Sequence, residues 1–411
     1  MRDPGKAPPK IVKPIGTGEV VQVRAYRLLT PLFGGGVDPG MSDPVTVVRP
    51  TEVRGQLRFW WRACRAGAYG AHGLARMRAD EALLWGAAST QKEPRPSKVH
   101  VRVTNIDPGT ARRPAFRAGE ALTYGAFPLT DKPSAMLRYG VTFELEIRYP
   151  ARRSEEVEAA LWAWETLGGI GARTRRGFGA LALDRVVRRE PPSAPAHGTA
   201  PASAERATAW LQQALTEHVV AGDGPAGVPR LQQQMTMRFT EPMNGEESWL
   251  GLLRQLKDFR QQRAHGARGP YGESMWPEPN AVRRRAAPKA PRLGHARNVD
   301  KFPRAAFGLP IIFHFKDVPP DPKDTTLKGG GSDPAERLAS RLILRPVACD
   351  RGRAVGLALI LDAPATPPGG LALHVGPRAL PVDMSITPTE LPDVPPLGGE
   401  PDVLLAFLNT L

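Results

Sequence analysis

The sequence of 411 residues predicts an α+β protein in which helices pack on antiparallel sheets. Three observations favour this fold class. Apolar and polar residues alternate in several short runs, a pattern typical of half-buried strands. Longer segments between them show the apolar spacing of amphipathic helices. A Pro/Ala/Ser-rich stretch at 189–203 indicates a linker, so we expect an N-terminal domain of residues 1–188 and a C-terminal domain of residues 204–411.

In the N-terminal half the predicted elements follow the order strand, helix, strand, strand, helix, strand. This is the order of the ferredoxin-like, or RNA-recognition-like, arrangement, in which both helices cover one face of the sheet. Val21, Val23 and Ala25 share one face of the first strand, and Thr51 and Ser154 are the expected helix caps. The strands are expected at 19–29, 98–106, 141–149 and 178–187.

The C-terminal half predicts a divergent version of the same arrangement. A strand and an amphipathic helix are again followed by two strands, but no second helix or closing strand is evident. A long basic loop is expected at 266–303, with a solvated or mobile tract as the alternative to nucleic-acid binding. The expected elements are strands at 230–239, 309–315, 338–347 and 355–361 and a helix at 246–263.

The charge balance favours a polyanionic partner. Lys and Arg total 56 against 41 Asp and Glu, which gives a net charge of +15 and a sequence pI of about 10.2. Such a surplus suits nucleic acid or an acidic membrane surface. The membrane reading ranks last, because the sequence has no basic amphipathic helix with lipid-seeking residues and no run long enough to span a bilayer. We expect a cytoplasmic protein, and Cys64 and Cys349 are too isolated for a disulfide framework or zinc site.

The most informative stretch is LGGIGARTRRGFGAL at 167–181, which joins a predicted helix to a predicted strand. Glycine permits a left-handed backbone whose N–H groups can surround an anion, and guanidinium groups suit phosphate oxygens. We interpret the stretch as a clamp on the phosphates of a nucleic acid. The alternative is a glycine-rich connection with solvated arginines. The residues that would bind RNA are Gly169, Gly171, Arg173, Arg175, Arg176, Gly177 and Gly179.

Three other segments carry candidate RNA-binding residues. Gly34, Gly35 and Gly36 form a second flexible loop, with a wide turn as the alternative. On the predicted helix from residue 52, four arginines form a stripe without an acidic residue at helical spacing, so a bound anion would relieve their repulsion; a solvated face is the alternative. The candidates are Arg54, Arg58 and Arg62 on this helix, next to Arg65, and Arg283, Arg284 and Arg285 in the long basic loop.

The motifs TPLFGGG at 30, RGQLRFWWR at 54 and GGIGARTRRGFGAL at 168 together resemble the RAMP superfamily of CRISPR proteins. Within it they are similar to first subunits of type III-B, or Cmr, effector complexes. FGLP at 307 and ERLASRLILRPV at 336 are similar to the second half of that family. The resemblance implies two ferredoxin-like domains and an RNA-binding subunit near the 3′ end of the guide RNA, in antiviral defence. Its implied partners are guide RNA, target RNA and other Cmr subunits.

The resemblance also implies that the chain is not a nuclease. Some RAMP relatives cleave RNA with a histidine or a loop aspartate, and the candidates here are His72, His265, Asp38 and Asp43. None has an evident catalytic partner, and an aspartate in a Gly/Pro turn is usually a turn residue. We therefore expect no catalytic residue, no metal and no cofactor. The alternative is a metal-independent endoribonuclease acting on CRISPR RNA.

Overall fold

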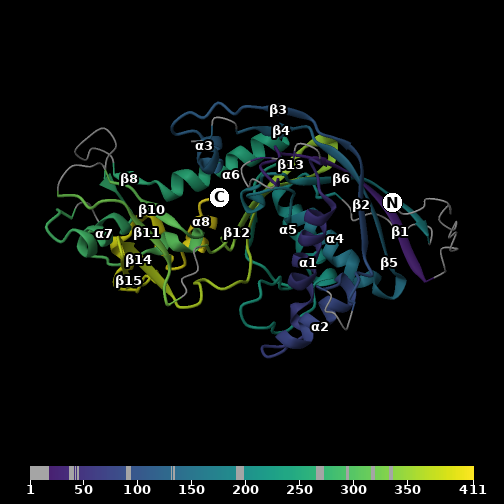
Figure 1. Cartoon of the computed structure of the whole chain (residues 1–411). Helices are drawn as coiled ribbons and strands as arrows, with labels where there is room; N and C mark the ends of the chain where they lie inside the picture. The colour runs from purple at the N-terminus through teal and green to yellow at the C-terminus, as the bar shows by residue number, and fades with distance from the viewer. Residues whose placement is uncertain are drawn as a thin grey trace, which may run out of the picture.

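The computed structural model shows a mixed α+β protein with several antiparallel sheets (Figure 1). The N-terminal half lies at one end of the molecule, and the C-terminal sheet that contains residues 311–313 and 371–375 lies at the other. No helix among the described residues is long and apolar enough to cross a membrane. The structure describes residues 18–36, 41, 43, 46–88, 94–130, 132, 135–190, 199–264, 273–292, 296–315, 320–332 and 337–411.

The N-terminal sheet contains the four predicted strands in the order β2-β5-β1-β6, all antiparallel to their neighbours. Two helices pack together over one face of this sheet, and the predicted order of elements is confirmed for this half. The strands are β1 (Glu19–Leu28), β2 (His100–Asp107), β5 (Thr142–Pro150) and β6 (Leu181–Glu190), and the helices are α1 (Pro50–Arg65) and α4 (Ser154–Leu167).

Additional elements are inserted into this arrangement. Helix α2 (Leu74–Trp85) follows α1, and a two-stranded arm with a short helix separates β2 from β5. The arm runs over the top of the molecule in Figure 1, where its helix α3 lies against α6. The arm consists of β3 (Thr110–Arg112), α3 (Ala121–Gly125) and β4 (Leu137–Tyr139).

Neither predicted helix cap forms. Arg49 precedes α1 and Arg153 precedes α4, and neither side chain forms a capping hydrogen bond with the first backbone N–H groups of its helix. Thr51 and Ser154 lie inside the first turns instead. Pro50 explains the earlier start of α1, because its fixed φ and missing N–H suit the first helical position.

The face of β1 that packs against the helices carries two buried polar side chains among apolar ones. Val21, Val23 and Ala25 share a face as predicted, but the helices cover the opposite face, which carries Gln22 and Arg24. Sequence alternation alone does not show which face is covered. A hydrogen-bonded network makes it possible to bury the polar side chains of Gln22 and Arg24.

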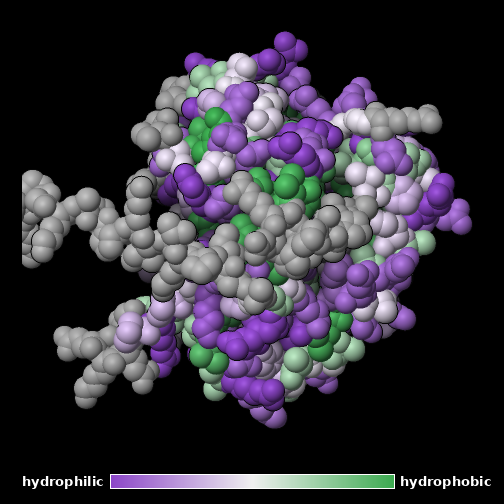
Figure 2. Space-filling model, turned by 90° about the vertical axis from the view of Figure 1, so that its right-hand side faces the viewer, coloured by the Kyte–Doolittle hydropathy of each residue, from purple (hydrophilic) through white to green (hydrophobic). Residues whose placement is uncertain are grey.

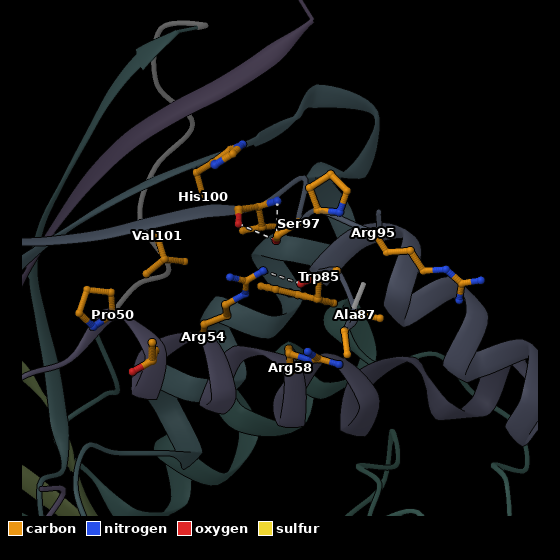
Figure 3. A pocket seen from close by; sticks show the side chains of 14 residues that line it. Pro50, Arg54, Arg58, Trp85, Ala87, Arg95, Ser97, His100 and Val101 are labelled. Carbon is orange, nitrogen blue, oxygen red and sulfur yellow. Dashed lines mark hydrogen bonds between the residues drawn. The ribbon is translucent and has the colours of Figure 1, made fainter. Parts of the chain in front are cut away.

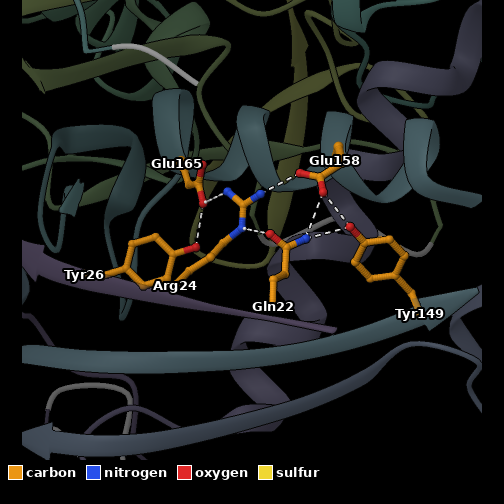
Figure 4. A network of polar contacts seen from close by, with 6 residues as sticks. All are labelled: Gln22, Arg24, Tyr26, Tyr149, Glu158 and Glu165. Atoms are coloured by element: carbon orange, nitrogen blue, oxygen red, sulfur yellow. Dashed lines mark hydrogen bonds and ion pairs between the residues drawn. The ribbon is translucent and has the colours of Figure 1, made fainter. Parts of the chain in front are cut away.

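The network joins β1 to α4 and β5 (Figure 4). The Arg24 guanidinium contacts Glu165 at 2.8 Å and Glu158 at 2.5 Å, and its Nε donates to Gln22 at 3.1 Å. The Tyr26 hydroxyl donates to Glu165 at 2.5 Å. Since Arg24 is 2% exposed, its charge is compensated almost entirely inside the protein.

The C-terminal half forms two larger sheets instead of one. Strands β12, β13 and β7 make a three-stranded sheet against α6, and β10, β11, β14 and β15 make a separate four-stranded sheet. The elements are α5 (Ala204–His218), β7 (Met237–Phe239), α6 (Gly245–Arg260), β8 (Arg263–Ala264), β9 (Glu273–Ser274), α7 (Glu278–Ala286), β10 (Ile311–Phe313), β11 (Thr325–Gly329), β12 (Leu342–Ala348), β13 (Ala354–Ile360), β14 (Leu371–Val375), β15 (Arg378–Val382) and α8 (Val403–Leu408).

Three predictions for this half are corrected. The strand expected at 230–239 is only three residues long, and the one expected at 309–315 belongs to the separate sheet. The stretch 266–303 is not one long loop, because it contains α7. A buried glutamate in the first turn of α7 and arginines in its last turn both favour a helix through its dipole.

The two halves share a hydrophobic core. The largest buried cluster contains Leu161 and Trp162 from α4 together with Leu211 and Leu215 from α5. Ile343 from β12 belongs to the same cluster. The division at residues 189–203 therefore separates segments of sequence that pack closely together.

Candidate nucleic-acid interface

The glycine-arginine stretch follows α4 and folds into a compact turn with a short 3-10 helix at Thr174–Arg176. Arg173 and Gly177 flank it in the left-handed region, at φ of 58° and 78°. Gly179 also has positive φ, and a Cβ there would lie 1.9 Å from the Ile170 carbonyl oxygen. These glycines are required by close backbone packing inside the turn.

The two predicted glycine loops meet. Ala172 donates a backbone hydrogen bond to Phe33 at 2.6 Å, and Gly179 donates one to Pro31 at 3.0 Å. A Cβ on Gly35 would lie 3.2 Å from the Cα of Gly171. The structure therefore brings Gly34–Gly36 together with the stretch that contains Gly169 and Gly171.

Glu52, in the first turn of α1, occupies the inner side of this junction. The Gly171 N–H donates to the Glu52 carboxylate. Burial raises the pKa of Glu52, while the Gly171 hydrogen bond and the charge of Arg49 oppose that shift. The Gly36 N–H is also satisfied internally, by Met41 at 2.8 Å. The N–H groups of Gly36 and Gly171 are thus directed to acceptors in the chain itself.

Arg175 and Arg176 connect the turn to the C-terminal half. Arg175 donates to the Ser340 carbonyl oxygen, and its guanidinium lies 5.7 Å from the ring centre of Phe59 on α1. Arg176 donates to the carbonyl oxygens of Phe307 at 2.8 Å and Leu342 at 3.3 Å. Both side chains therefore have a structural role, which the sequence did not reveal.

These arginines form a cationic cluster with a residue that the sequence analysis missed. The arginine cluster consists of Arg173, Arg175 and Arg176 together with Arg260, at the end of α6. Burial lowers the pKa of Arg173, and the charge of Arg260 lowers it further. Burial, followed by the charge of Arg260, lowers the pKa of Arg176 to about 9. The only sequence signal for Arg260 was its place in the last turn of an amphipathic helix.

The arginine cluster lacks a compensating carboxylate. Within the described ranges, the four side chains form no ion pair, and their hydrogen bonds go to carbonyl oxygens and to the Tyr124 hydroxyl. The Nε atoms of Arg173 and Arg260 are buried without a hydrogen-bond partner. Carbonyl dipoles do not neutralise charge, so a bound anion would offset both the repulsion and the lost hydration.

The arginine stripe on α1 has a partner that the helix itself does not supply. Glu81 of α2, 7% exposed, accepts from Arg58 at 2.8 Å and from Arg62 at 2.6 Å. Arg54 donates to the Trp85 carbonyl oxygen at 2.8 Å (Figure 3). The expectation of unrelieved repulsion is therefore corrected. Three guanidinium charges against one carboxylate still leave a net charge of two at this surface.

The third predicted group lies elsewhere. Arg283, Arg284 and Arg285 are on α7, at the opposite end of the molecule from α1 and α2 (Figure 1). Arg283 pairs with Asp321 at 2.7 Å, and Arg285 pairs with Asp300 at 2.8 Å. The structure does not bring these residues together with the arginine cluster.

On β1 and β5, the open face of the N-terminal sheet has no aromatic side chain on which an RNA base could stack. On β1 and β5 this face carries aliphatic, hydroxyl and charged residues, and Arg148 pairs with Glu19 across the two strands. No Phe, Tyr or Trp lies on it in either strand. Figure 2, which views this end of the molecule, shows a largely hydrophilic surface with small hydrophobic patches. Base stacking on the sheet, as in RNA-recognition domains, is not supported here.

The candidate catalytic residues form no site among the described residues. His72 is exposed in a turn, and the Asp43 carboxylate accepts from the Thr46 N–H at 2.7 Å. Asp38 and His265 lie outside the described residues. No group of three His, Cys, Asp or Glu in the described chain is placed to hold a metal ion.

Comparison with known proteins identifies the family. The model of the RAMP superfamily matches residues 26–182. This part of the chain belongs to the RAMP superfamily. The RAMP match includes both glycine loops, the whole of α1 and the start of β6.

Two curated relatives from Pyrococcus furiosus are Cmr subunits. This chain is 26% identical over 145 residues to CRISPR system Cmr subunit Cmr1-1, which covers 34% of this chain and 41% of the relative. It is 25% identical over 182 residues to Cmr subunit Cmr1-2, covering 38% of this chain and 92% of the relative. The alignment thus spans less than half of the length of Cmr1-1.

One solved structure, that of apo Cmr1, shows a similar fold. The crystal structure of apo Cmr1 from Pyrococcus furiosus aligns with a TM-score of 0.51 and 17% identity, covering 84% of this chain and 88% of that chain. A chain in a cryo-EM structure of the type III-B Cmr-beta complex bound to cognate target RNA aligns with a TM-score of 0.49 and 13% identity, covering 84% and 95%.

Proposed function

We propose that this chain is an RNA-binding, non-catalytic subunit of a type III-B CRISPR effector complex, acting in the cytoplasm in antiviral defence. Its partners would be guide RNA, target RNA and other Cmr subunits, with contacts near the guide 3′ end. The names of the two curated relatives support membership of a Cmr complex. The RAMP match covers the segment that supplies Arg173, Arg175 and Arg176, while Arg260 lies outside it.

The arginine cluster is the observation that carries RNA binding. Four guanidinium groups from two separate segments converge, and the described chain supplies no carboxylate to neutralise them. Holding such charges together costs free energy, which a polyanion would offset. The phosphodiester backbone of RNA is a polyanion of suitable spacing, and guanidinium groups bind phosphate oxygens with directed hydrogen bonds.

We also propose that both halves are ferredoxin-like. The strand order β2-β5-β1-β6 with two helices on one face supports this for the N-terminal half. In the C-terminal half, β7, α6, β12 and β13 would be the first four elements of the arrangement, and the sheet order β12-β13-β7 fits their places. The second helix and closing strand would then be missing from that half.

A matched pair of substitutions on α6 tests RNA binding. Arg260 belongs to the arginine cluster, whereas Arg254 is exposed on the same helix. Anisotropy of a labelled single-stranded RNA would be measured with Arg260→Gln, Arg254→Gln and the unmodified chain at low salt. We expect Arg260→Gln to weaken binding about fivefold to tenfold, as for loss of one charge-assisted contact, and Arg254→Gln to change it less than about twofold.

Equal affinities for the two variants would mean that the arginine cluster is not on the RNA. Thermal unfolding of each variant is the control for folding. The same labelled RNA, incubated with the chain in EDTA and run on a denaturing gel, is expected to stay intact. Site-specific cleavage would contradict the non-catalytic role and support the endoribonuclease alternative.

A further inference from the structure

A pocket opens beside α1, on the side that faces α2 and β2 (Figure 3). Its volume is about 560 Å³, within the range of small-ligand sites. Arg54, Arg58 and Arg95 give it a basic character, and none of the residues that line it is an aspartate or glutamate. The lining residues are Pro50, Thr51, Arg54, Arg58, Trp85, Gly86, Ala87, Ala88, Arg95, Pro96, Ser97, Val99, His100 and Val101.

The basic wall is held in place by contacts from α2. Arg54 points across the pocket, and one of its terminal nitrogens donates to the Trp85 carbonyl oxygen at 2.8 Å. Arg58 uses its Nε to contact Glu81, which lies outside the lining. A guanidinium group has several N–H donors, so each arginine is positioned by one contact and keeps others for a ligand. The first turn of α1, at Thr51, adds a partial positive charge.

The opposite wall is apolar and closely packed. Trp85 is fully buried behind it, and Ala87, Pro96 and Val101 face the pocket. Gly86 has φ of 77°, and a Cβ there would lie 2.7 Å from the Ser97 backbone nitrogen. The residues after α2 therefore pack directly against the residues before β2, which makes a firm surface for a flat, weakly polar group.

We propose that this pocket binds one unpaired nucleotide. The phosphate would lie against Arg54 and Arg58 beside the first turn of α1, and the base would lie against Ala87 and Pro96. One nucleotide combines the two properties that the walls require, a negative charge and a flat apolar face. No carboxylate lines the pocket to repel the phosphate.

The source of the nucleotide is either a bound RNA strand or a free nucleoside monophosphate. The RNA source rests on the proposed function. Helix α1 supports it, because Phe59 on this helix lies under Arg175 of the arginine cluster, while Arg54 and Arg58 line the pocket. An RNA strand neutralised by the arginine cluster would then extend over α1 to place one nucleotide in the pocket.

Filling the pocket without changing its charge tests the proposal. Ala87→Trp places an indole where the base would lie, and Ala111→Trp, at an exposed position on β3, is the matched control. The full-length chain would be titrated with labelled single-stranded RNA by anisotropy and with AMP and UMP by calorimetry. We expect Ala87→Trp to weaken binding of RNA, a mononucleotide or both by about tenfold and Ala111→Trp by less than about twofold.

Loss of RNA binding alone identifies a strand as the source, and loss of mononucleotide binding identifies a free nucleotide. Unchanged binding of every ligand in Ala87→Trp overturns the pocket proposal while leaving RNA binding by the arginine cluster intact. If the unmodified chain binds mononucleotides but no RNA, the pocket stands and the proposed function fails. Arg54→Met, which keeps the side-chain length but removes the charge, repeats the test if Ala87→Trp does not fold.

Discussion

The guanidinium of Arg345 donates a hydrogen bond of 2.5 Å to the carbonyl oxygen of Gly168. Arg345 is on β12 and fully buried, and Gly168 is the first residue after α4. A second bond of 2.9 Å reaches the carbonyl oxygen of Leu181, where β6 begins. One arginine of the C-terminal half thus fixes both ends of the glycine-arginine stretch.

Replacing Arg345 should therefore destabilise the whole chain. Arg345→Leu would leave buried carbonyl oxygens without donors, and we expect a loss of about 2–4 kcal/mol in the free energy of unfolding. Urea unfolding followed by tryptophan fluorescence measures this. Arg238→Leu, at an exposed position on β7, is the control and should change stability by less than about 0.5 kcal/mol. Equal stabilities would show that the Arg345 bonds do not hold the halves together.

Gly179 should not tolerate a side chain. Its φ is 59°, and a Cβ would overlap the Ile170 carbonyl oxygen, so we expect Gly179→Ala to cost about 2–4 kcal/mol. Gly55, exposed in the middle of α1, has open space at its Cβ. Gly55→Ala should instead gain about 0.5–1 kcal/mol by reducing the entropy of the unfolded chain. Thermal unfolding compares the two, and a tolerated Gly179→Ala would contradict the tight packing of the turn.

Glu52 should make the stability of the protein depend on pH. Its pKa is raised, chiefly by burial, so the stability it contributes is present at acidic pH and is lost as pH rises through that raised pKa. Glu52→Gln can still accept from the Gly171 N–H but does not ionise. The melting temperature of the variant, relative to the unmodified chain, should therefore rise between about pH 4 and pH 7. A constant difference would argue against the raised pKa.

Arg173 should contribute to the salt dependence of RNA binding. Asparagine tolerates the left-handed backbone at this position, so Arg173→Asn removes the charge with little strain. Loss of one phosphate contact on a single strand should reduce the slope of log affinity against log salt by about 0.7 between about 50 and 200 mM salt. Anisotropy titrations at several salt concentrations measure the slope. A slope equal to that of the unmodified chain would place Arg173 away from the phosphates.

The sequence predicted the N-terminal elements because their patterns are local. When one face of a strand or helix is buried, its own residues show the pattern. Residues alternate along β1 and β5, and apolar residues recur at helical spacing along α1 and α4. The C-terminal half was harder for the same reason. Strand β7 is short, and α7 lies in a Pro- and Arg-rich stretch without a long apolar stripe.

The roles of the arginines depend on residues that are far from them in the sequence. The sequence placed Arg58 and Arg62 on one helical stripe, but only the fold shows that Glu81 of α2 lies between them. The same holds for Arg260, which lies close to Arg173 and Arg176 although it is more than 80 residues away from them in sequence. The contact between the two glycine loops was not predicted, because it joins segments far apart in the sequence.

By itself, the sequence determined the strand and helix order of the N-terminal half, the basic surplus and the motifs of the superfamily. These depend on residue type and spacing, which are properties of a single segment. The tertiary structure decided which face of β1 is covered, which charges are compensated and which arginines meet without a carboxylate. Those outcomes depend on contacts between segments far apart in the chain, and a linear pattern does not encode such contacts.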